Sequence, residues 1–116
     1  MSYQNNTVEY KSGHLAGGGV EYTKLAGGGY EVVASGGPDA RIAITDIIAG
    51  GSATAIKFKT SSNESTSDAN GNLIAFVPAA KDVHYPYSSA IRLAKGDTLM
   101  CDGSAGAMVI VHYRVD

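Results

Sequence analysis

Residues 41–59 have the sequence RIAITDIIAGGSATAIKFK, which predicts a strand, a glycine turn and a returning strand. The first half is rich in β-branched residues, and GGS at 50–52 supplies the turn. In the returning half Ile56 and Phe58 alternate with lysines. Successive side chains of a strand point to opposite faces, so this alternation predicts an antiparallel sheet with one core face and one solvated face.

Strand signals recur at roughly ten-residue spacing along the chain, and helical periodicity is almost absent. The segment 73–77 is expected to be a buried strand, and 108–115, the most apolar segment, to lie centrally in a sheet. Residues 60–72 are wholly polar and predict an exposed loop, while 81–89 predict an irregular crossing. The complete set of expected strands is 20–25, 30–34, 41–48, 54–59, 73–77, 90–93, 98–101 and 108–115.

This spacing predicts an all-β fold, an antiparallel two-sheet sandwich that is jelly-roll-like and has about eight short strands. The chain of 116 residues has room for one domain, which we place at 13–116. Residues 1–12 are polar with scattered apolar side chains, and we expect them to form a flexible N-terminal arm.

An internal repeat with a period of ten residues overlaps the first two of these strands. HLAGGGVE at 14–21 recurs as KLAGGGYE at 24–31. Glycine supplies the positive φ of tight turns, so the repeat predicts a β-meander that joins 20–25 to 30–34. A phosphate-binding loop needs a Lys-Ser or Lys-Thr pair after its glycines and then a helix, and the repeat has neither.

Composition narrows the classes of partner. Nine basic and eleven acidic residues are spread along the chain without a basic cluster, so we expect no nucleic-acid partner. No apolar run approaches a membrane span, and the N-terminus has no signal-peptide pattern, so we expect synthesis in a cytoplasm and no membrane partner. Leu, Ile, Val and Phe make up about a fifth of the chain, a small core that favours homo-oligomerisation.

The residues that commonly carry chemistry are scattered. Cys101 is the single cysteine and is expected to be a small buried hydrophobic residue. His14, His84 and His112 are far apart and form no close pair, so we expect no metal site. No serine lies in a Gly-x-Ser-x-Gly elbow, and Asp97 and Asp102 are typical turn residues. We therefore predict no catalytic, cofactor-binding or metal-binding residue, and a protein that is not an enzyme.

Tyrosine is the remaining feature, with seven residues and no tryptophan. A tyrosine ring offers apolar area with one polar tip, which suits a subunit interface. Half-buried strand tyrosines are the ordinary alternative, and stacking on a sugar, with the Tyr85-Pro86-Tyr87 segment as its centre, is a third. The candidate interface residues are Tyr3, Tyr10, Tyr22, Tyr30, Tyr85 and Tyr87.

The last quarter of the chain resembles a known family. AIRLAKGDTL at 90–99 and AMVIVHY at 107–113 are similar to the closing strands of small β-sandwich virion proteins of tailed bacteriophages, and the likeness extends in style over 40–116. The resemblance implies a capsid decoration (cement) protein, or a head or tail accessory subunit. It implies a homotrimer without an active site, made in the host cytoplasm and bound to the major capsid protein or other proteins of the virion.

One alternative stays open beside this resemblance. A carbohydrate-binding β-sandwich for host or glycan recognition would also use a small β-domain with tyrosines and Asn/Ser-rich loops. The two candidate functions differ in the partner that they require, which is a protein shell for the virion protein and a sugar for the carbohydrate-binding domain.

Overall fold

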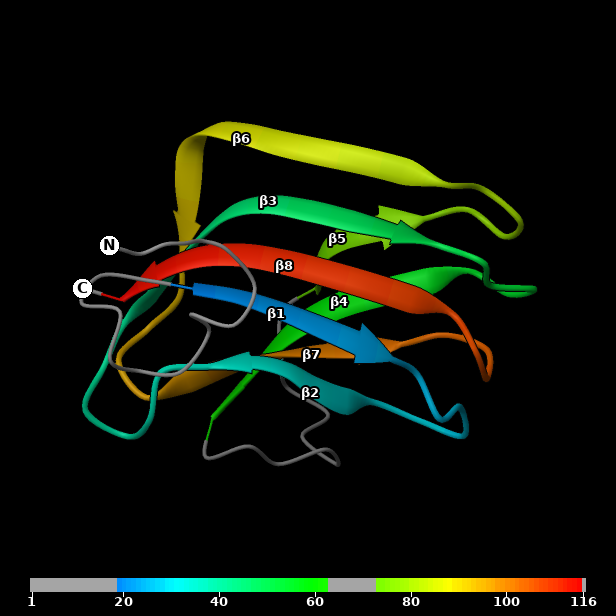
Figure 1. Ribbon diagram of the computed structural model, residues 1–116. Coiled ribbons are helices and arrows are strands. Elements are labelled where there is room, and N and C mark those ends of the chain that lie inside the picture. Colours follow the sequence, from blue (N-terminus) through cyan, green and yellow to red (C-terminus); the bar gives the residue numbers. More distant parts are fainter. Residues whose placement is uncertain (1–18, 63–72, 116) are drawn as a thin grey trace, which may run out of the picture.

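The computed structural model describes residues 19–62 and 73–115. Within these ranges the chain forms two stacked four-stranded sheets, the sandwich expected from the sequence (Figure 1). The segment 1–12, expected to be an arm, lies outside the described residues. The strands are β1 (Gly19–Lys24), β2 (Glu31–Ser35), β3 (Ile42–Gly50), β4 (Ile56–Ser62), β5 (Leu73–Val77), β6 (Val83–Arg92), β7 (Asp97–Asp102) and β8 (Met108–Val115).

The strand order identifies the sandwich as a jelly roll. One sheet has the order β1-β8-β3-β6 and the other β2-β7-β4-β5, and neighbouring strands in both sheets are antiparallel. The first strand therefore pairs with the last, the second with the seventh, the third with the sixth and the fourth with the fifth. This is the order produced when one long antiparallel hairpin is rolled into two sheets.

The core lies between the two sheets and follows the alternation seen in the sequence. Ile56 and Phe58 of β4 are fully buried in it, as the period-two pattern predicts. On β8, Val109 and Val111 face the same core, and the intervening residues are more exposed. The strand β8 lies between β1 and β3, so its expected central position is confirmed.

The predicted meander over the glycine repeat is wrong. β1 pairs with β8 and β2 pairs with β7, so the glycine segment between them carries the chain from one sheet to the other. Its turn is held by Glu31, whose carboxylate accepts the backbone N–H groups of Ala26 and Gly27. Gly27 has φ of +83°, and a Cβ there would lie 2.9 Å from the Ala105 nitrogen. Glycine serves a close crossing here rather than a hairpin.

Residues 81–89 are also not an irregular crossing, because most of them belong to the ten-residue strand β6. Pro86 is tolerated because β6 is an edge strand, where one row of N–H groups has no ladder partner. The segment 73–77 does form a strand, but β5 is the edge of its sheet and only Val77 is fully buried. Residues 60–62 extend β4, and the rest of the predicted loop, 63–72, lies outside the described residues.

Candidate functional site

The outer face of the β1-β8-β3-β6 sheet gathers apolar side chains in one row. Strand register places Tyr22 of β1 beside Ile110 of β8, Ile110 beside Ile48 of β3, and Ile48 beside His84 of β6. Alternation points these side chains away from the core, because their neighbours Val109 and Val111 point into it. The row therefore forms a surface on the outside of the sandwich.

At one end of this row the surface is hollowed into a groove of about 410 Å³, called here the Tyr22 groove. Tyr22 and Met108 flank it with 52% and 49% of their area exposed, and the Tyr22 hydroxyl donates to the Met108 sulfur at 3.0 Å. Asp82 stands at the rim, where its Oδ1 accepts the Gly51 N–H at 3.1 Å. The side chains that line the groove are Tyr22, Ile48, Asp82, Val83, Met108 and Ile110.

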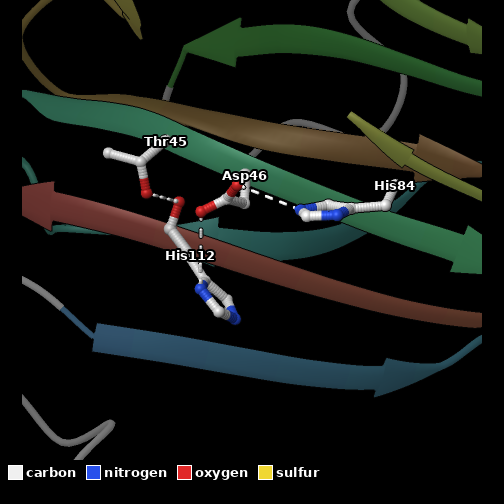
Figure 2. Close-up of polar contacts among 4 residues, drawn as sticks. All are labelled: Thr45, Asp46, His84 and His112. Carbon is white, nitrogen blue, oxygen red and sulfur yellow. Dashed lines mark hydrogen bonds and ion pairs between the residues drawn. The ribbon is translucent and has the colours of Figure 1, made fainter. Parts of the chain in front are cut away.

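Next to the groove, His84 of this row joins a small polar cluster with Asp46 and His112 (Figure 2). The Asp46 carboxylate lies between two imidazoles, with its Oδ1 3.1 Å from His84 Nε2 and its Oδ2 3.7 Å from His112 Nδ1. A β-bulge positions Asp46, since the register of β3 shifts between Ile44 and Asp46 against both neighbouring strands. The hydroxyl of the intervening Thr45 donates to the His112 carbonyl at 3.1 Å.

The side chains of this cluster interact only weakly with one another. Its three side chains are partly exposed, with His84 the most open, so their mutual attraction is screened by water. Thr45, the nearest hydroxyl in Figure 2, is directed at a backbone carbonyl and not at either ring. Across residues 19–62 and 73–115 no group of three His, Cys, Asp or Glu side chains has the geometry to hold a metal ion.

The candidate interface tyrosines that the structure describes lie in different environments. Tyr3 and Tyr10 lie outside the described residues, and Tyr22 is exposed in the groove. The ring of Tyr30 lies 4.2 Å from Lys59 Nζ, and burial, followed by the charge of the nearby Asp102, raises the pKa of its hydroxyl.

The tyrosines of β6 are directed inward instead. Tyr85 and Tyr87 both pack against the core. The Tyr85 hydroxyl donates to the Phe76 carbonyl at 3.0 Å, and burial is the first cause of the raised pKa of Tyr87. Both side chains are therefore only partly exposed, which reduces the surface on which a sugar could stack.

The single cysteine is buried, as the sequence predicts. Cys101 has no exposed area, and burial, with smaller contributions from Asp102 and Glu31, raises the pKa of its thiol to about 12. The thiolate is the reactive form of cysteine, so this residue is a poor nucleophile in the folded protein.

The sequence predicts that the histidines form no close pair, and the cluster around Asp46 was not predicted. His14 lies outside the described residues, whereas His84 and His112 meet because β6 and β8 flank β3. Their separation in the sequence gives no sign of this, and the bulge that turns Asp46 outward has no glycine to mark it. The Tyr22 groove was missed for the same reason, because four strands that are distant in sequence build it.

Fold and site together define a jelly-roll domain with one open, partly apolar sheet face. Within the described ranges no helix has the length and apolarity needed to span a membrane. Comparisons with models of known protein families, with curated proteins and with solved structures found no match.

Proposed function

We propose that this protein is a non-enzymatic virion structural subunit, a capsid decoration (cement) protein that binds and stabilises a phage shell as a homo-oligomer. The observation that carries the proposal is the Tyr22 groove, an apolar hollow left open on the outer face of a jelly-roll sheet. Jelly rolls recur in viral capsid proteins and lectins, both of which act by binding. Exposed apolar patches with polar surroundings mark interaction sites.

The size of a sheet face decides how much surface the domain could bury against a partner. A stable protein interface buries about 800 Å² on each partner. The described chain measures 40 × 27 × 26 Å, so one sheet face is large enough to supply an interface of that size. On a shell such a contact is repeated many times, and each copy adds its own free energy of binding.

The proposal is tested on particles released from cells that carry the gene. We expect mass spectrometry of purified particles to detect the chain in a fixed ratio to the major capsid protein. We also expect sedimentation of the isolated chain at micromolar concentration to show an oligomer. A monomer that is absent from particles would overturn the proposal.

Carbohydrate binding, the alternative function, is supported by one observation. Tyr22 offers an exposed ring in the groove that Asp82 also lines, and the two suit stacking on a sugar and hydrogen bonding to its hydroxyls. A glycan array probed with the wild-type chain and with Tyr22→Ala separates the two functions. Binding that is lost in the variant would favour the sugar, and an array without signal would leave the structural subunit.

A further inference from the structure

We propose that the Tyr22 groove of one copy holds the exposed Phe76 and Leu73 side chains of a second copy, so that copies join head to tail into a closed ring. This inference rests on the proposed function, because it names the self-contact of the proposed homo-oligomer.

The inserting element is the edge strand β5. Leu73 and Phe76 keep 58% and 48% of their area exposed, the largest apolar side chains on this edge. The strand is fixed from the other sheet, because the Tyr85 hydroxyl donates to the Phe76 carbonyl. Two large apolar side chains on a well-held strand form a preorganised knob, which lowers the entropic cost of binding.

The groove matches the knob in size and chemistry. A cavity of roughly 150 Å³ holds a benzene ring, so a groove of about 410 Å³ has room for a phenyl ring and a neighbouring aliphatic side chain. Ile48 and Ile110 line the groove, and Tyr22 offers a wall for an aromatic pair. Buried aromatic anchors in such pockets dominate the binding energy of many interfaces.

Charge at the two surfaces is complementary. Lys57 of β4 is the register partner of Phe76 and is exposed, so the knob carries a positive charge at its side. Asp82 is exposed at the rim of the groove and carries a negative charge. When Phe76 enters the groove, attraction between Lys57 and Asp82 favours one orientation of the incoming copy.

The positions of the two surfaces determine whether the contact between copies is head-to-tail or two-fold. The groove lies on the β1-β8-β3-β6 sheet. By contrast, β5 is the edge strand of the opposite sheet (Figure 1). Two different patches make a head-to-tail contact, and repetition of that contact produces a ring when the rotation closes. A contact between two copies of the same patch would produce a two-fold dimer instead.

The test is disulfide cross-linking of the full chain with single cysteines at the two surfaces. Met108→Cys places a thiol at the groove, and Lys57→Cys places one beside Phe76 without removing that ring. The native Cys101 is buried and contributes little background. We expect covalent dimers when the two single variants are mixed and not when either is oxidised alone. The double variant Met108→Cys/Lys57→Cys is expected to give a covalent oligomer of fixed size on a non-reducing gel.

Val32→Cys is the matched control, because Val32 is exposed on the edge strand β2, outside both surfaces. Dimers of Met108→Cys alone would indicate two-fold pairing of the grooves and overturn the inference. An unlimited ladder from the double variant would overturn the closed ring. If the mixture fails to cross-link while native mass spectrometry still shows an oligomer, this inference fails and the proposed function stands; a monomer contradicts both.

A second measurement does not depend on cysteine chemistry. Phe76→Ser is expected to raise the dissociation constant of the oligomer at least about tenfold, whereas Val32→Ser leaves it within about twofold. Circular dichroism and thermal melting verify that both variants fold. A wild-type dissociation constant for a folded Phe76→Ser variant would overturn the inference.

Discussion

Met100 and Met108 carry the same side chain on the outward sides of the two sheets, yet Met100 has no exposed area and Met108 is 49% exposed. Met100 lies on β7, where its neighbours Leu99 and Cys101 face the core, so it projects to the opposite side. The comparison shows that β7 is covered on both faces and β8 on one. The covered outer side of β7 therefore contributes to the stability of the subunit, whereas the outer side of β8 remains open.

The polar residues of the covered face agree with this difference. Thr98 and Ser61 are almost fully buried, and the Thr98 hydroxyl donates to the Ser61 carbonyl at 3.2 Å. Lys59 is 9% exposed and lies under the ring of Tyr30. Buried polar groups are normally satisfied by hydrogen bonds or charge contacts. On the open face, by contrast, Asp46 and its two histidines remain in contact with water.

The largest expected effect comes from truncating the two methionines. Met100→Ala should lower the free energy of unfolding by about 2–5 kcal/mol, because it leaves a cavity in a packed site. Met108→Ala should change it by less than about 0.5 kcal/mol, since an exposed side chain leaves no cavity. Urea unfolding at equal protein concentration measures both, and equal losses would remove the distinction between the faces.

Two lysines of β4 provide the next comparison. Lys59→Ala should cost about 1–2 kcal/mol, because it removes a cation from the Tyr30 ring and a packed aliphatic stem. Lys57→Ala, at an exposed position on the same strand, should lie within about 0.5 kcal/mol of wild type. Thermal melting of the two variants decides the matter, and a Lys57 variant that is the less stable of the two would contradict the covered face.

Alkaline pH probes the burial of the core side of β7. The folded protein holds the Cys101 thiol proton with a pKa of about 12, whereas an unfolded chain releases it near pH 8.5. The free energy of unfolding should therefore be unaffected below about pH 8 and fall by about 1–2 kcal/mol by pH 10. Urea unfolding at pH 7.5 and 10 measures this loss.

Cys101→Ala is the control for the alkaline experiment and should reduce the loss between the two pH values. Tyr113 contributes separately, because burial followed by the charge of Glu21 raises the pKa of its hydroxyl to about 12. The ordinary pKa of tyrosine is about 10, so this second loss begins at higher pH. A wild-type protein with constant stability from pH 7.5 to 10 would show that the thiol is accessible to water.

The smallest effect is expected on the open face. Asp46→Asn keeps a similar shape and removes the charge between His84 and His112. Because these contacts are partly exposed, the free energy of unfolding at pH 7 should change by less than about 1 kcal/mol. Differential scanning calorimetry measures the change, and a loss above about 2 kcal/mol would place Asp46 among the residues that hold the fold.

The sequence predicted those parts of the fold that depend on local alternation. Ile56 and Phe58 identify a core-facing strand without knowledge of its neighbours, and the apolar run at 108–115 identifies a central one. The end of β6 was predicted as a strand over 90–93, but residues 83–89 were missed because Pro86 and the serines at 88 and 89 interrupt the apolar pattern. Only the place of β6 at a sheet edge explains these residues.

The candidate site could not be predicted, because it depends on which strands become neighbours. Tyr22 was selected as an interface residue on its chemistry alone, and the structure places it in the groove. Its neighbours Ile48 and Ile110 come from strands distant along the chain. The glycine repeat indicated the wrong pairing, since a ten-residue spacing fits a crossing between sheets as well as a hairpin within one.

The central place of β8 has a consequence for synthesis in the cell. β1 finds its sheet partner only in residues 108–115, and β2 finds its partner only in β7. A nascent chain that has left the ribosome as far as the end of β6 can therefore form the β3–β6 and β4–β5 pairs. At that stage β1 and β2 still lack the strands with which they pair. Closure of the sandwich must therefore wait until β7 and β8 have been synthesised and have left the ribosome.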